Sequence, residues 1–165
     1  MSSKPAITII AVGKLRESYW RDAEAEYRKR LGAHTTKLTI VEVADEPTPD
    51  DASAAQEETI RRREGERILA QIGDKDYAVA LDLGGKTLDS VAFAAHLERA
   101  TAERGASRFT FVIGGSLGLH EAVLARADLR LTFGAFTYPH QMMRIILLEQ
   151  LFRAGKINRG EAYHK

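Results

Sequence analysis

The sequence predicts an α/β fold in which a mainly parallel sheet is covered by helices on both faces. Short runs rich in β-branched and aromatic residues alternate with longer charged or amphipathic runs along the chain, and this alternation is typical of repeated βαβ units. Three of the short runs end in glycine-rich segments, where a parallel sheet commonly opens onto a ligand crevice. The length of 165 residues suits a single domain covering residues 1–165.

Two strands and two helices are expected in the first part of the chain. Residues 6–12 form an apolar run that predicts a strand, and the charged run at 19–31 predicts a helix. Residues 38–43 alternate in apolar character, which predicts a second strand. Proline and aspartate at residues 45–51 favour a loop, and the Arg- and Glu-rich residues 53–72 predict a long polar helix.

Strands and helices also alternate in the rest of the chain. Asp89 or Ser90 is a suitable N-cap for one of the helices, and Pro139 suits the first turn of the last helix because proline has no backbone N–H. The expected elements are a strand at 77–83 closed by Gly84-Gly85, a helix at 91–103, a strand at 109–113, a short helix at 120–127, a strand at 129–133 and a long helix at 139–154.

The composition argues against several classes of protein. Hydrophobic residues make up 44% of the chain and charged residues 28%, as in an ordinary globular protein. The absence of cysteine excludes a disulfide framework and a thiolate metal site. The first apolar run is too short for a secretory signal, and no run approaches the roughly 20 apolar residues of a membrane span. We therefore expect a cytoplasmic protein that is not in the membrane.

The charge is distributed unevenly along the chain. A net charge of +1 argues against a broad basic surface for non-specific binding of nucleic acid. Residues 42–66 nevertheless hold nine acidic and three basic residues, whereas residues 141–165 hold five basic and two acidic residues. The basic end is compatible with a local RNA contact, and equally with an ordinary solvated surface.

The glycine-rich strand ends are the first candidate site. Residues 82–86, 113–118 and 133–138 each follow an expected strand, and glycine there allows a ligand to approach main-chain groups closely. Three ordinary turns are the alternative. The 113–118 segment lacks the G-x-G-x-x-G spacing of a dinucleotide fold, and a phosphate loop ending at residues 85–87 would need glycine where Ala80 stands.

The last helix and the C-terminal tail hold the second group of candidates. Residues 145–148 are apolar around the whole helix, which indicates a subunit interface. Arg144 needs an anionic partner, either a structural carboxylate or a substrate phosphate. Tyr163, His164 and Lys165 combine a ring, an imidazole and a cation that suit an unstacked RNA base and its phosphates, although such a tail is more often a frayed end. The remaining histidines lack metal-ligand spacing, so we expect no metal site.

Several ordered motifs together resemble the ribosomal RNA large-subunit methyltransferase H family of the SPOUT class. The resemblance covers the whole chain and is specific as an ordered set. It rests on residues 9–15 (IIAVGKL), 64–69 (EGERIL), 81–86 (LDLGGK), 111–116 (FVIGGS), 138–144 (YPHQMMR) and 163–165 (YHK).

The resemblance implies both a fold and a reaction. It implies a C-terminal trefoil knot and a homodimer packed through the knot region, which agrees with the apolar last helix. The implied reaction is S-adenosylmethionine-dependent methylation of N3 of a pseudouridine in 23S rRNA, on assembled ribosomes. The alternatives are a non-catalytic knotted protein that binds the ribosome or the cofactor and, less favoured, an unrelated nucleotide-hydrolysing enzyme.

The resemblance also implies the site residues. Backbone groups at the three strand ends would hold the cofactor, at Leu81, Gly114, Gly115, Phe133, Gly134, Ala135, Phe136, Thr137 and Tyr138. The RNA would contact His140, Arg144, Tyr163, His164 and Lys165. Arg144 and His164 are the catalytic candidates, because a cation near the base nitrogen stabilises the anion that forms there. The sequence does not identify the general base.

Overall fold

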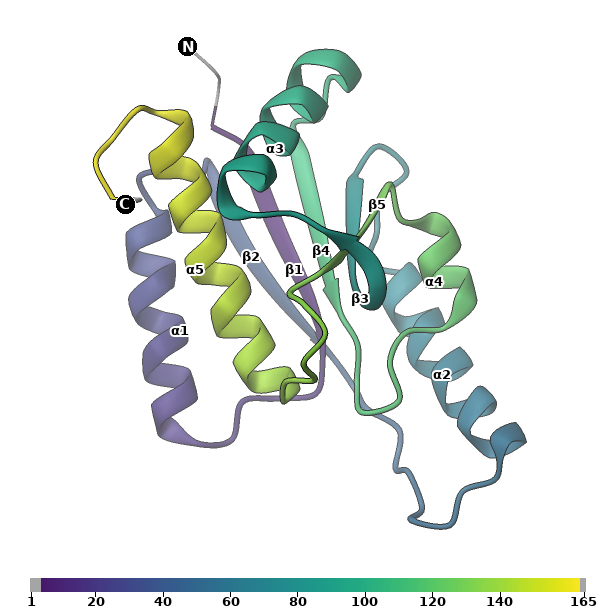
Figure 1. Ribbon diagram of the computed structural model, residues 1–165. Coiled ribbons are helices and arrows are strands. Elements are labelled where there is room, and N and C mark those ends of the chain that lie inside the picture. Colours follow the sequence, from purple (N-terminus) through teal and green to yellow (C-terminus); the bar gives the residue numbers. More distant parts are fainter. Residues whose placement is uncertain (1–3, 164–165) are drawn as a thin grey trace.

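The computed structural model describes residues 4–163 as a parallel sheet between two layers of helices (Figure 1). The strand order is β2-β1-β4-β3-β5, and every neighbouring pair is parallel. The strands are β1 (Ala6–Val12), β2 (Lys37–Val43), β3 (Tyr77–Thr87), β4 (Arg108–Ile113) and β5 (Leu129–Thr132).

Helices cover both faces of this sheet. On one face α1 (Ser18–Leu31) and α3 (Ser90–Arg104) pack on either side of α5 (His140–Asn158) (Figure 1). On the other face α2 (Ala54–Leu69) packs against the short α4 (Glu121–Arg126). The predicted α/β class, parallel sheet and two-sided covering are confirmed. None of the helices in residues 4–163 is long and apolar enough to cross a membrane.

Alternate residues of the central strand belong to the two hydrophobic cores. Ile9 is fully buried in the larger core beneath α1, α3 and α5, whereas Ile10 is fully buried in the smaller core beneath α2. Successive side chains of a strand point to opposite faces, so a strand covered on both sides is apolar at nearly every position. The continuous apolar run at residues 6–12 therefore has a direct structural cause.

The predicted end of β3 at Gly84-Gly85 was wrong. The strand continues to Thr87, and its pairing with β5 shifts register between Leu81 and Lys86. A Cβ atom on Gly85 would lie 2.7 Å from the backbone of Arg130. The glycine is therefore needed for the close approach of two strands, and it does not mark a turn.

The boundaries of α5 also differ from the prediction. Pro139 is the N-cap, one residue before the helix, and the helix continues past Ala154 to Asn158. It passes through Gly155, where a Cβ atom would lie 2.7 Å from the ring of His34. Glycine is destabilising inside a helix, but here only glycine leaves room for the imidazole. At α3 the N-cap is Asp89, one of the two expected residues.

Candidate functional site

A pocket of about 940 Å³ lies where β3, β4 and β5 end and α5 begins. Its volume is at the upper end of the range for small-molecule sites. Parallel strands leave such a crevice at their carboxyl ends, beyond the last backbone hydrogen bonds. The predicted crevice is thus present as one continuous pocket.

Most of the residues predicted to hold a cofactor line this pocket. They are Leu81, Gly114, Gly115, Phe133, Gly134, Phe136, Thr137 and Tyr138. Ala135 belongs to the same loop but is exposed and does not line the pocket. His140, predicted as an RNA contact, is part of the lining.

The lining also contains residues that the sequence analysis did not select. Arg61 reaches the pocket from α2, and Met143 reaches it from the first turn of α5. Arg61 is far in sequence from the glycine-rich loops and is part of no motif, whereas Met143 belongs to the 138–144 motif but was not predicted as a site residue. Only the packing of α2 and α5 at the same end of the sheet brings them there.

Glycines shape the loop between β4 and α4. At Gly114 a Cβ atom would lie 2.9 Å from Leu119 and 3.1 Å from the backbone of Gly118. Gly118 itself has a φ of +79°, which residues with a side chain rarely adopt. The loop is therefore folded tightly on itself, with little side chain between its main-chain groups and the pocket.

The loop after β5 is held by a local hydrogen-bond arrangement. The Thr132 hydroxyl donates to the carbonyl of Gly134 (2.8 Å) and accepts from the N–H of Gly134 (3.2 Å). Gly134 has a φ of +111°, and nothing lies within 4 Å of the position of an added Cβ atom. Apolar walls beside glycine-rich main chain fit a nucleoside ligand, whose polar edges need hydrogen-bond partners and whose ring needs apolar contact.

The charged side chains of the pocket differ in their pairing. Arg61 forms ion pairs with Glu57 and Glu58, and Asp82 pairs with Arg130 at 2.8 Å. These contacts hold both side chains at the wall of the pocket. Paired in this way, the Arg61 and Asp82 side chains are less able to move toward a ligand than unpaired side chains would be.

His140 is the titratable side chain of the lining whose pKa is shifted. It is half-buried at the first position of α5, and burial lowers its pKa, with a further decrease from Arg144 and a small opposing effect of Asp45. Within residues 4–163 no hydrogen bond of the ring is present. The neutral imidazole is therefore the form favoured at neutral pH.

Arg144 lies behind the pocket and does not line it. Only 2% of the residue is exposed. One terminal nitrogen donates to Glu42 (2.8 Å) and Glu24 (3.2 Å), and the other donates to the carbonyl of Gly13 (3.3 Å). Of the two partners considered from the sequence, the structural carboxylate is the one that the folded chain supplies. The guanidinium ties the start of α5 to α1, β2 and the end of β1.

The C-terminal tail is described only as far as Tyr163. The phenol of Tyr163 donates to Glu149 (3.3 Å), and its ring packs edge-on against Phe152 and beneath the guanidinium of Arg153. None of these residues lines the pocket in the same chain. His164 and Lys165, the other predicted tail residues, lie outside the described part of the chain.

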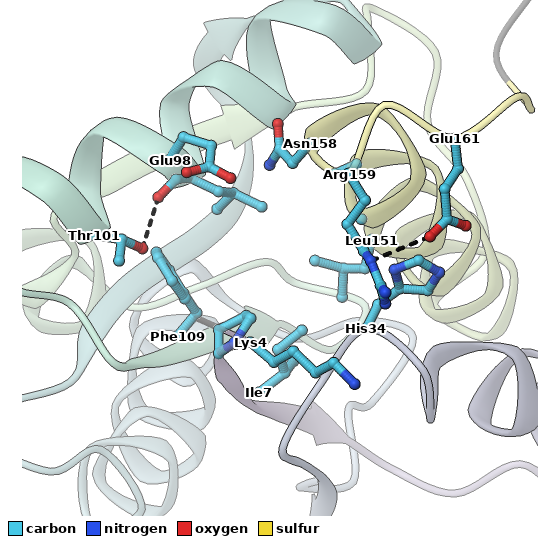
Figure 2. A pocket seen from close by; sticks show the side chains of 14 residues that line it. Lys4, Ile7, His34, Glu98, Thr101, Phe109, Leu151, Asn158, Arg159 and Glu161 are labelled. Carbon is cyan, nitrogen blue, oxygen red and sulfur yellow. Dashed lines mark hydrogen bonds and ion pairs between the residues drawn. The ribbon is translucent and has the colours of Figure 1, made fainter. Parts of the chain in front are cut away.

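A second cavity, of about 370 Å³, lies at the opposite end of the sheet (Figure 2). Ile7, Phe109 and Leu151 form its apolar floor, and the buried His34 lies beside it. Among residues 4–163, none of the predicted site residues lines this cavity. Across residues 4–163, no three His, Cys, Asp or Glu side chains are grouped so that they could hold a metal ion.

Comparison with known proteins identifies the family of the chain. The family described as "Predicted SPOUT methyltransferase" matches residues 6–164. The protein named "Ribosomal RNA large subunit methyltransferase H" from Carboxydothermus hydrogenoformans is 53% identical over 159 residues, which are 96% of this chain and 99% of that protein. With a family match and a relative that both span nearly its whole length, the chain belongs to the SPOUT methyltransferase family.

Proposed function

We propose that the protein uses S-adenosylmethionine to methylate N3 of a pseudouridine in 23S rRNA on assembled ribosomes, as a cytoplasmic homodimer. The observation that carries this proposal is the single pocket formed by the residues that the family resemblance assigns to the cofactor, in a chain that is 53% identical to a ribosomal RNA methyltransferase. Family membership supports methyl transfer, and the printed name of the relative supports rRNA as the substrate.

The three loops of the pocket would hold the cofactor mainly through main-chain groups. Leu81, Gly114 and the stretch 133–138 surround the pocket from separate strands, so a ligand there would be bent between them. When bound, the cofactor supplies an electrophilic methyl group on a sulfonium. The chain supplies position, and correct alignment of reacting groups accounts for a large part of the acceleration of such displacements.

Arg144 would contribute by positioning the pocket. Its contacts with Glu24, Glu42 and the carbonyl of Gly13 fix the N-terminal turn of α5 against the rest of the fold, and His140 and Met143 of this turn line the pocket. Arg144 is only 2% exposed and does not line the pocket, so its guanidinium is not accessible to an RNA phosphate, although its buried Nε–H has no hydrogen-bond partner among residues 4–163. The positioning role is therefore favoured over the direct RNA contact considered from the sequence.

The homodimer would complete the site. Tyr163 packs on Glu149, Phe152 and Arg153 of its own chain, and none of these residues lines the pocket of that chain. Because Tyr163 packs outside the pocket of its own chain, the proposed role of the tail is to contribute an aromatic ring, an imidazole and a cation to the pocket of a second copy. In this arrangement Tyr163, His164 and Lys165 grip the RNA, and His164 places a cation near the methylated base.

The trefoil knot belongs to the same proposal. After β5 at one edge of the sheet, the chain returns across the face to pack α5 between α1 and α3. The loops on this path are those that line the pocket. A chain that passes through one of these loops would hold the three cofactor segments in a fixed relation, and such knots are rare exceptions to the usual rules of connection.

The experiment that tests the function is transfer of labelled methyl from S-adenosylmethionine to intact ribosomes, separated subunits and naked 23S rRNA, with the product nucleoside identified. We expect 3-methylpseudouridine on intact ribosomes alone. A cofactor that binds without any transfer would instead support the alternative, a non-catalytic knotted protein that binds the ribosome or the cofactor.

Two glycine variants provide a matched control for the position of the cofactor. Gly118 and Gly105 both have a φ in the left-handed region, +79° and +65°, and an added Cβ atom would meet nothing within 4 Å at either position. Each change to alanine therefore has a similar backbone penalty, about 1 kcal/mol. Only Gly118 lines the pocket, so Gly118→Ala alone is expected to weaken cofactor binding, by about tenfold.

A further inference from the structure

The lining of the pocket contains four titratable side chains, which are Arg61, Asp82, Tyr138 and His140. Guanidinium and phenol groups act as proton donors at neutral pH and do not accept a proton there. The Asp82 carboxylate is held by Arg130 at 2.8 Å. Among the described residues, His140 is thus the lining group with a ring nitrogen able to accept a proton near neutral pH.

The other described histidines have hydrogen-bond partners or lie away from this pocket. The Nε2 atom of His96 lies 2.7 Å from the hydroxyl of Tyr77, and His120 caps α4 and contacts Glu58. The ring of His34 borders the second cavity at the opposite end of the sheet (Figure 2). The His34 ring also has no hydrogen bond among residues 4–163. His140 differs from His96 and His120 because its ring forms no hydrogen bond in that part of the chain, and from His34 because it lines the pocket at the carboxyl ends of the strands.

The end of β1 and the start of α5 define the position of the His140 ring. Its Cε1 atom would lie 3.4 Å from a Cβ atom on Gly13, which has a φ of +92°, so the end of β1 packs closely against the imidazole. Its backbone begins α5, whose first turn is anchored by Arg144 to Glu42. A ring at the pocket wall whose nitrogens have no partner among residues 4–163 can come within hydrogen-bond reach of a substrate proton, which is the geometry that general-base catalysis requires.

We infer that His140 is the general base that removes the N3 proton of the target base, an inference that rests on the function proposed above. The N3–H bond breaks, its proton moves to a ring nitrogen of His140, and its electron pair remains on N3. That pair forms the new bond to the methyl carbon as the carbon–sulfur bond breaks and its electrons pass to sulfur. One positive charge is lost at the sulfonium and one appears on the imidazole, so the total charge of the pocket is unchanged.

The electrostatic surroundings suit this role. Burial is the main cause that lowers the pKa of His140, the guanidinium of Arg144 lowers it further, and Asp45 opposes them by a smaller amount. The charged groups that line the same pocket are Arg61 and Asp82. A neutral imidazole is ready to accept a proton at pH 7, and proton transfer by a positioned group contributes about 10²–10⁴-fold in rate.

The pH dependence of methyl transfer tests the assignment. With His140 as base, the single-turnover rate on ribosomes rises through the histidine pKa and is flat above it. For His140→Gln, the rate at pH 7 is about 10²–10⁴-fold lower and rises tenfold per pH unit, because the reaction then depends on prior loss of the N3 proton. His96→Gln is the matched control, because it removes an imidazole outside the pocket, and it keeps the flat profile.

Two further readouts separate a catalytic imidazole from a structural one. Calorimetry is expected to give the same cofactor affinity for His140→Gln within a few-fold, and added imidazole is expected to restore part of the rate of His140→Gly. An NMR titration of the protein alone is expected to place the pKa of His140 below the ordinary value of about 6.5.

Each contrary result has a defined meaning. A His140→Gln variant with the wild-type rate, a rate loss that is equal at every pH, or a pKa of His140 above about 7 would overturn the assignment. A wild-type protein that transfers no methyl group would overturn the proposed function itself, so the two failures are distinguishable.

Discussion

Replacement of Arg144 by alanine tests how the start of α5 is held in place. The change removes the donor to Glu24, Glu42 and the Gly13 carbonyl. Loss of one partner from a buried ion pair costs about 3–5 kcal/mol. The side chain of Glu42 is 36% exposed and that of Glu24 is 14% exposed, so water relieves part of the penalty at Glu42. We expect a loss of about 2–4 kcal/mol in the free energy of unfolding.

Urea unfolding of the wild type and the variant, followed by circular dichroism, measures this loss. Arg62→Ala is the control, because Arg62 and Glu66 form an exposed ion pair with side chains 51% and 65% exposed, and such pairs contribute little. Arg144→Lys keeps the charge with a single nitrogen and is expected to fall between the two, because lysine cannot reproduce the planar fork of donors. A loss below about 1 kcal/mol for Arg144→Ala would refute the anchoring role.

The functional effect of the same variant is separable from its stability. At a temperature where Arg144→Ala remains folded, we expect methyl transfer to be lost and cofactor binding to be nearly retained, because the variant loses the anchor behind His140 and keeps the loops proposed to hold the cofactor. Cofactor binding is measured by calorimetry and the oligomeric state by sedimentation. A variant that sediments as a monomer would show that Arg144 acts through the dimer.

Three further predictions follow from other parts of the fold. Gly85→Ala places a Cβ atom 2.7 Å from the backbone of Arg130 and Leu131, so a loss of more than about 2 kcal/mol and weaker amide protection of β5 are expected in hydrogen exchange. Burial raises the pKa of Glu64 above 4.5. The folded chain therefore binds this proton more tightly than the unfolded chain does. As the pH rises through the folded pKa, the contribution of Glu64 to the free energy of unfolding is lost. Glu64→Gln is expected to remove that slope in urea unfolding measured against pH, and an unchanged slope would contradict it. Sedimentation is expected to give twice the chain mass of 18.3 kDa, and a monomer would contradict the homodimer.

The order and type of the helices and strands were predictable because the spacing of apolar residues along the sequence indicates each of them. The apolar run at residues 6–12 has a side chain in one core or the other at nearly every position, and such runs alternating with helices identify a parallel sheet. The predicted crevice followed from the rule that parallel strands end at one edge of the sheet. These inferences need only local sequence and general topology.

The errors arose where distant backbone segments touch. Gly84 and Gly85 have the composition of a turn, and only the proximity of Arg130 explains why Gly85 continues a strand. Gly155 similarly has the composition of a helix end, but it accommodates His34 from the turn after α1. No local pattern distinguishes a glycine required by a neighbouring segment from a glycine required by its own backbone angle.

The loops that form the site could be predicted from the sequence, but the partners of its charged side chains could not. Glycine-rich segments indicate where a ligand can approach main chain, and the 133–138 stretch was found in this way. Arg144 was conspicuous as a cation in an apolar run, yet its carboxylate partners come from α1 and β2. Residues 24, 42 and 144 are too far apart in sequence for spacing to pair them.

The most direct test of the central claim is where S-adenosylhomocysteine, the product form of the cofactor, perturbs the backbone amide NMR spectrum. Shifts are expected in residues 113–119 and 131–143, most of which line the pocket at the carboxyl ends of the strands. No shifts are expected around His34, Leu151 and Arg159 at the opposite cavity. Shifts confined to that second cavity, or no shifts at a saturating concentration, would contradict the assignment of the cofactor site.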